Sequence, residues 1–100
     1  MLESKSIMQE IEMNMDKNKK FGVKKIGLFG SFVNNKQTEK SDLDVLVEFE
    51  KGQKTFDNYM DLKFFLEKLF DLRVDLVITG AIKPDLKPYI LGNAQYVPGL

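Results

Sequence analysis

The chain has 100 residues, of which 43% are hydrophobic, and this suits a single small domain over residues 1–100. Fifteen basic residues balance fifteen acidic ones, so bulk charge indicates neither a nucleic-acid partner nor a membrane partner. Cysteine and histidine are absent, which excludes disulfides, thiolate catalysis, a Ser-His-Asp hydrolase and a His-ligated metal site.

The first predicted element is an amphipathic helix that runs to about Asn18. Its apolar residues recur at intervals of three and four positions: Ile7, Met8, Ile11 and Met15. Ser6 followed by Gln9 matches a capping box at the start of this helix. The apolar stretches near the N-terminus are too short for a signal peptide or a spanning helix, so we expect a cytoplasmic protein.

Two strands are predicted next, separated by a polar loop. The first runs from Val23 to Phe29 and stops at Gly30, where one helical turn begins near Ser31 before a loop over 34–40. The second spans 42–49, and its alternation predicts one apolar face and one chemically distinct face. The residues on this second face are Asp42, Asp44, Leu46 and Glu48.

The second half begins with a helix over 56–70, which carries a broad apolar face. A strand over 73–78 follows, with Asp75 between apolar neighbours, and then a short helix around 86–91 and an edge strand at 96–97. This order predicts an α/β (α+β) fold, in which helices pack on one face of a small mixed sheet.

The pair Asp42 and Asp44 indicates a metal site. Carboxylates at positions i and i+2 of a strand project from one face, with Cα atoms roughly 7 Å apart. Such oxygen ligands favour Mg²⁺ or Mn²⁺, and two ions can hold nucleotide phosphates together with an attacking oxygen. Asp75 would add a third carboxylate if its strand pairs beside that of Asp44.

Gly30 and Ser31 fit the other half of a nucleotide site. Glycine lets the backbone approach a phosphate closely, and serine offers a hydroxyl and an amide to the same oxygens. Each feature also has an ordinary structural explanation: Gly30-Ser31 as a turn, Ser41-Asp42 as a strand entry, and Asp75 as an ion-pair partner of Arg73 or Lys63. Their joint order favours nucleotide chemistry.

These motifs resemble the minimal nucleotidyltransferases of the DNA polymerase beta superfamily. The stretch over 22–32 looks like the family's strand and signature turn, the stretch over 41–49 like its metal-binding strand, and Val74 to Val77 like the strand of the third acid. The resemblance implies a polymerase beta palm-like fold, Mg²⁺ and ATP. It also implies that Gly30 and Ser31 contact phosphates, and that Asp42, Asp44 and Asp75 bind metal and carry catalysis.

One feature departs from the family pattern. Members often have Ala-Arg-Gly where this chain has Val33, Asn34 and Asn35, so Asn34 replaces a guanidinium that could stabilise phosphate charge. Lys36 is a partial substitute and therefore a further nucleotide-binding candidate. Asn35 is able to take the left-handed conformation that glycine favours.

The resemblance further implies a partner. Minimal nucleotidyltransferases typically accompany a helical HEPN toxin, and this chain has no residues for an acceptor domain. We therefore expect an antitoxin that transfers AMP to a Tyr of that toxin, in an assembly whose stoichiometry stays open to a homo-oligomer or hetero-oligomer. Two alternatives remain: an inactive antitoxin that neutralises its partner by binding only, and an enzyme that modifies a small molecule.

Overall fold

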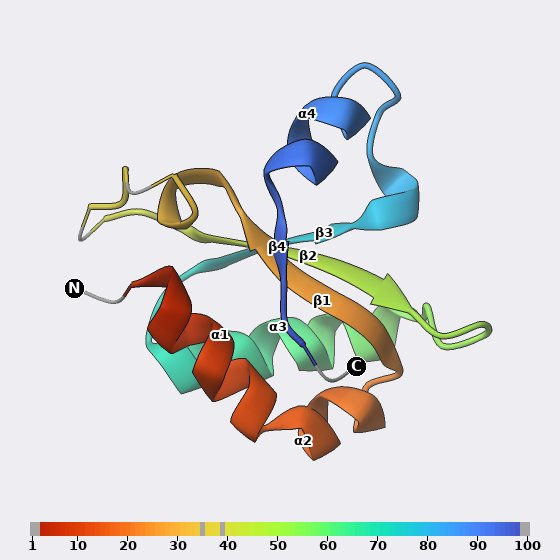
Figure 1. Cartoon of the computed structure of the whole chain (residues 1–100). Helices are drawn as coiled ribbons and strands as arrows, with labels where there is room; N and C mark the ends of the chain where they lie inside the picture. Colours follow the sequence, from red (N-terminus) through yellow and green to blue (C-terminus); the bar gives the residue numbers. More distant parts are fainter. Residues whose placement is uncertain (1–2, 35, 39, 99–100) are drawn as a thin grey trace.

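The computed structural model describes residues 3–34, 36–38 and 40–98 (Figure 1). The helices are α1 (Ser4–Met13), α2 (Met15–Lys20), α3 (Phe56–Phe70) and α4 (Lys87–Asn93), with 3₁₀ turns η1 (Gly30–Phe32) and η2 (Thr79–Ala81). The strands are β1 (Val23–Phe29), β2 (Leu43–Phe49), β3 (Val74–Ile78) and β4 (Gln95–Tyr96). The strands and the long helix lie close to their predicted positions.

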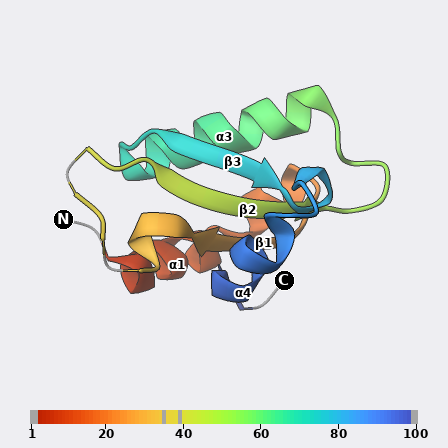
Figure 2. The same ribbon diagram turned by 90° about the horizontal axis from the view of Figure 1, so that it is seen from above.

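The four strands form one mixed sheet in the order β3-β2-β1-β4. β1 is antiparallel to β2 and to β4, whereas β2 and β3 are parallel. Parallel neighbours need a crossover connection, and α3 provides it by returning the chain along the sheet (Figure 2). The strand that carries the predicted third acid therefore lies directly beside the strand that carries the Asp pair.

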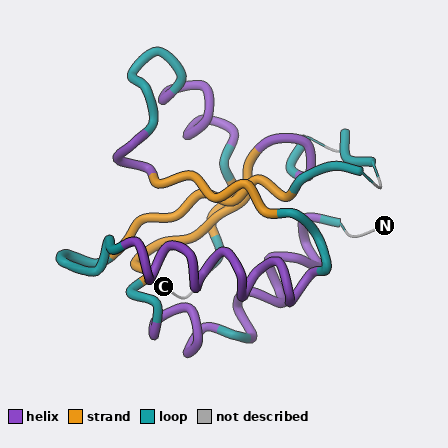
Figure 3. Tube along the Cα trace, turned by 180° about the vertical axis from the view of Figure 1, so that it is seen from behind, coloured by secondary structure: helices purple, strands orange, loops and turns teal. Residues whose placement is uncertain are grey.

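One face of the sheet forms the core. Helices α1, α2 and α3 lie on this side, as the views from the front and from behind both show (Figures 1 and 3). Ile7 and Ile11 of α1 and Leu62 and Leu66 of α3 are fully buried against alternate residues of the strands. This arrangement confirms the predicted α+β fold class, and it leaves the other face of the sheet for chemistry.

The short helix α4 and the turn η2 lie on the opposite side of the sheet from the other helices (Figure 1). The two elements contact β1 and β2, respectively. This cover explains why Leu46 is fully buried although it shares the second face with Asp44. The second face is therefore partly apolar under α4 and polar beyond it.

The predicted N-terminal helix is two helices, because the chain breaks at Asn14, whose backbone (φ −107°, ψ 29°) is not helical. The buried amide of Asn18 donates to the carbonyls of Ile11 and Asn14, both at 3.1 Å, and so ties the two pieces together. The capping box was a wrong prediction, since Ser6 lies inside α1 and the N-cap residue is Glu3. No described helix is both long and apolar enough to cross a membrane.

Thr55 fixes the start of α3. Its side-chain oxygen accepts a hydrogen bond from the backbone N–H of Asn58 at 3.1 Å. We expect Thr55→Ala to lower the free energy of unfolding by about 1 kcal/mol, because an amide of the first helical turn loses its acceptor. Chemical denaturation measures this change. Thr55→Ser is the matched control, and equal losses in both variants would contradict the cap.

Candidate active site

The three predicted acids lie on the same face of the sheet, on two neighbouring strands. Asp44 of β2 is the direct register partner of Asp75 of β3. Asp42 precedes β2 by one residue. Because it lies two residues from Asp44, it belongs to the same face of the sheet. Asp42 and Asp75 are exposed, whereas Asp44 is half-buried. This face is opposite the hydrophobic core, so water and ligands can reach the carboxylates.

The Gly30-Ser31 turn lies against Asp44. β1 and β2 pair so that Phe29 is opposite Asp44, and the chain turns into η1 at the next residue. Gly30 has φ 74°, and a Cβ there would lie 2.9 Å from Cγ of Asp44 and overlap its Oδ2. The turn is therefore closed to other residues both by its backbone conformation and by the carboxylate that fills the space.

The pKa of Asp44 rises from its ordinary 3.8 to about 6, mainly because of burial and also because of the nearby carboxylates of Asp75 and Asp42. A hydrogen bond from the backbone of Ser31 works in the opposite direction. Three acids and one amide donor thus converge on a small area. A divalent cation would relieve the repulsion, which is the electrostatic signature expected of a metal-binding carboxylate group.

Asp42 has a basic neighbour. The Nε atom of Arg73 lies 4.0 Å from Oδ1 of Asp42, and the two side chains are 87% and 48% exposed. The sequence suggested Arg73 or Lys63 as an ion-pair partner of Asp75. Among the described residues, Asp75 takes part in no ion pair. The alternative role of Asp75 as an ion-pair partner is therefore not supported.

The loop after η1 contains the other predicted phosphate ligand. The backbone N–H of Lys36 donates to the carbonyl of Ser31 at 2.9 Å, so this exposed lysine is anchored beside the turn. Asn34 is exposed, and its N–H donates to the Gly30 carbonyl at 3.1 Å. Asn35 lies outside the described residues.

The residue types at this site suit a divalent cation. Asp42, Asp44 and Asp75 supply only oxygen ligands, and the overlap of a Gly30 Cβ with Asp44 marks a turn shaped around this carboxylate. Within the described ranges, no three acidic side chains lie close enough together to form a complete metal-binding site. An ion held by all three carboxylates would require them to lie closer together than they do in this structure.

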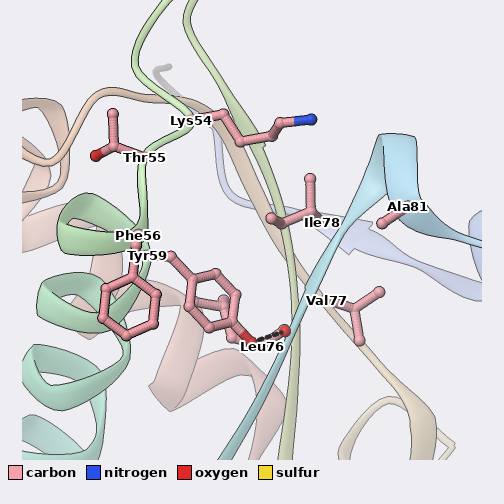
Figure 4. Close-up of a pocket in the computed structure, with 8 residues that line it drawn as sticks. All are labelled: Lys54, Thr55, Phe56, Tyr59, Leu76, Val77, Ile78 and Ala81. Carbon is pink, nitrogen blue, oxygen red and sulfur yellow. Dashed lines mark hydrogen bonds between the residues drawn. The ribbon is translucent and has the colours of Figure 1, made fainter.

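A pocket of about 500 Å³ lies elsewhere, between the start of α3 and the outer edge of β3 (Figure 4). Tyr59 lines it and donates from its hydroxyl to the carbonyl of Leu76 at 2.7 Å. Phe56, which is 77% exposed, also lines it, together with Val77 and Ala81. The pocket is mostly apolar and does not include any of the acids.

The sequence model of the nucleotidyltransferase domain matches residues 9–97. The chain belongs to this family. It is accordingly a nucleotidyltransferase, and the family resemblance inferred from the motifs is confirmed. The match covers β2 and β3, which belong to the acid-bearing part of the sheet, and the Gly30-Ser31 turn that precedes β2, so the site just described lies within the family's domain.

The nucleotidyltransferase is 38% identical over 95 residues to protein adenylyltransferase MntA of Thermococcus cleftensis, covering 90% of this chain and 95% of that one. A solved structure assigned to the minimal nucleotidyltransferases is 31% identical, with a TM-score of 0.80 and coverage of 94% and 95%. A chain of a tri-AMPylated Shewanella oneidensis HEPN toxin in complex with MNT antitoxin is 21% identical, with a TM-score of 0.64 and coverage of 93% and 73%. The last likeness shows the fold alone.

Proposed function

We propose that this nucleotidyltransferase transfers AMP from ATP to a Tyr hydroxyl of a helical HEPN toxin and so acts as its antitoxin. The relative from Thermococcus cleftensis is named a protein adenylyltransferase, and the similar fold from Shewanella oneidensis occurs with an AMPylated HEPN toxin. Both support a protein acceptor. The small-molecule alternative has no comparable support.

The observation that carries the proposal is the packing of Asp44 against Gly30. It unites the phosphate-binding turn and the acids in one site, because the carboxylate occupies the space that a side chain at Gly30 would need. Asp75 adds the third carboxylate, because it is the register partner of Asp44 on the neighbouring strand. A structural turn and an unrelated acidic pair would not need this contact.

Mg²⁺, when bound, would neutralise phosphate charge and favour the attacking oxygen in its ionised form. Asp42 and Asp44 would hold it, and Asp75 on the neighbouring strand would act as the base. The backbone at Gly30 and Ser31 would then orient the phosphate chain, and Lys36 would add positive charge beside the turn. The residues of the chain thus supply positioning and charge, which are the main requirements of this type of transfer.

In the proposed step, the Tyr oxygen of the toxin attacks the α-phosphorus of ATP. The bond between that phosphorus and the oxygen bridging to the β-phosphate breaks, and pyrophosphate leaves. Asp75, which is exposed, accepts the phenolic proton. The products are Tyr-AMP on the toxin, pyrophosphate and a proton that passes to solvent.

The test uses the purified protein, Mg²⁺, ATP labelled at the α-phosphate, and a HEPN toxin. We expect label on the toxin with the unaltered chain and none with the Asp42→Asn, Asp44→Asn double variant, since two metal ligands lose their charge. Asp57→Asn, at an exposed position near the start of α3, is the matched control and should label normally. A toxin variant with its acceptor Tyr replaced by Phe should stay unlabelled.

Equal labelling by the unaltered chain and the double variant would contradict the proposed site. Absence of label in every case, with toxin still neutralised, would instead favour an antitoxin that acts by binding only. The family resemblance motivates this second candidate, because Asn34 departs from the arginine of the family pattern described above. Neutralisation of the toxin by the double variant decides between the two.

A further inference from the structure

Arg73 is the only arginine among the fifteen basic residues of the chain, and it lies at the proposed active site. A guanidinium differs from an ammonium group because its planar fork of N–H donors matches two oxygens of a phosphate at once. The single position at which this chain uses Arg instead of Lys therefore places a group suited to phosphate beside the acids.

The sheet register places Arg73 on the face of the acids. The N–H of Leu43 donates to the carbonyl of Arg73 at 2.8 Å, so the parallel pairing of β2 and β3 extends one residue back. Asp42 then neighbours Arg73 just as Asp44 neighbours Asp75. Residues two apart share a face, so a two-by-two arrangement results, with three carboxylates and one guanidinium.

The backbone around Arg73 is held by hydrogen bonds, whereas its side chain is exposed. Its carbonyl is held by Leu43, and the next N–H, that of Val74, donates to Oε2 of Glu67 at 3.0 Å. The side chain itself is 87% exposed, and its Nε atom lies 4.0 Å from Oδ1 of Asp42. An exposed pair of this kind contributes little and is readily exchanged for a better partner.

Resting on the proposed function, we infer that Arg73 is a phosphate-binding residue of the ATP site, since its guanidinium lies beside Asp42 on the face of the acids. In the free protein it partly neutralises Asp42. With a divalent cation held by that carboxylate, the guanidinium would be free to contact the phosphate chain of ATP. There it binds two phosphate oxygens and stabilises the negative charge that grows on the leaving pyrophosphate.

Two binding measurements on the purified chain separate this role from simple support of Asp42. The first is Mn²⁺ affinity without nucleotide, followed by electron paramagnetic resonance. The second is ATP affinity at saturating Mg²⁺, by calorimetry. Arg73→Gln should weaken ATP binding about tenfold or more, as expected for loss of a charge-assisted hydrogen bond. It should leave Mn²⁺ affinity unchanged or increased, since a competing cation is removed from Asp42.

Arg73→Lys should fall between the unaltered chain and Arg73→Gln in ATP affinity, because it keeps the charge and loses the fork. Lys51→Gln, which makes the same charge change at an exposed turn, should leave both affinities within about twofold, in the range of a solvated surface charge. Thermal unfolding of each variant confirms that it is folded.

Weakening of both Mn²⁺ and ATP binding by Arg73→Gln would overturn the inference, since Arg73 would then act through the acids. Unchanged ATP binding would overturn it as well. In either case, continued AMP transfer to the toxin by the unaltered chain would leave the proposed function standing. Failure of the unaltered chain to bind ATP at all would overturn the proposed function and this inference together.

Discussion

Asp44→Asn should abolish the proposed AMP transfer and at the same time stabilise the metal-free protein at neutral pH. We expect the rate of transfer to fall on the order of 10³-fold or more, since a proposed metal ligand loses its charge. Loss of a residue that only supports a ligand costs about 10- to 100-fold. The stabilising effect has a separate cause. Ionisation of Asp44 is unfavourable because its carboxylate is half-buried and lies near two other acids.

Burial, together with the carboxylates of Asp75 and Asp42, raises the pKa of Asp44 from 3.8 to about 6 in the folded chain. Between these two values the folded state holds a proton that the unfolded state releases. The free energy of unfolding therefore decreases as the pH rises from about 4 to about 6, and the penalty is complete at neutral pH. With allowance for solvent screening of a half-buried group, the penalty is about 1–2 kcal/mol.

Asn removes this penalty and keeps an oxygen that accepts the hydrogen bond from Ser31. At pH 7.5 in a chelating buffer, the melting temperature of Asp44→Asn should exceed that of the unaltered chain by on the order of 5–10 °C. The difference should vanish near pH 4. Addition of Mg²⁺ should stabilise the unaltered chain and not the variant. A melting difference that is equal at pH 4 and pH 7.5 would contradict the raised pKa.

The sequence alone allowed the positions of the strands to be predicted closely. β1 was predicted at Val23 to Phe29 and is found there, because Gly22 and Gly30 border a segment in which most residues are apolar. Alternation over 42–49 similarly gave the correct faces of β2. These signals are local, and a periodic pattern with clear turn residues determines them without knowledge of the rest of the chain.

Pairwise relations across the sheet could not be predicted in the same way. The acidic side chain that pairs with Arg73 is Asp42 and not Asp75. This depends on the register between β2 and β3, which the long α3 crossover leaves open in the sequence. The break at Asn14 was missed for a related reason. It depends on hydrogen bonds that the buried Asn18 makes after packing, and helical periodicity continues through it.

The second large effect concerns Gly30. Gly30→Ala should destabilise the fold and reduce transfer, because the new methyl group is placed at φ 74° and overlaps the Asp44 carboxylate. The conformational cost alone is about 1–2 kcal/mol. Displacement of packed atoms adds about 1–3 kcal/mol. Transfer should fall on the order of 10²-fold, since even a small misplacement of a reacting group has an effect of this size.

Gly52→Ala separates the two contributions. Gly52 has φ 80°, close to the value at Gly30, but a Cβ there would meet no atom within 4 Å. This variant should show only the conformational cost, about 1–2 kcal/mol by chemical denaturation, with normal transfer. If Gly30→Ala lost no more stability than Gly52→Ala and kept its activity, the Gly30 turn would not be shaped around Asp44. A larger loss of stability in Gly30→Ala than in Gly52→Ala would show that the contact with Asp44 causes the difference. It would thereby support the link between the Gly30-Ser31 turn and the acids.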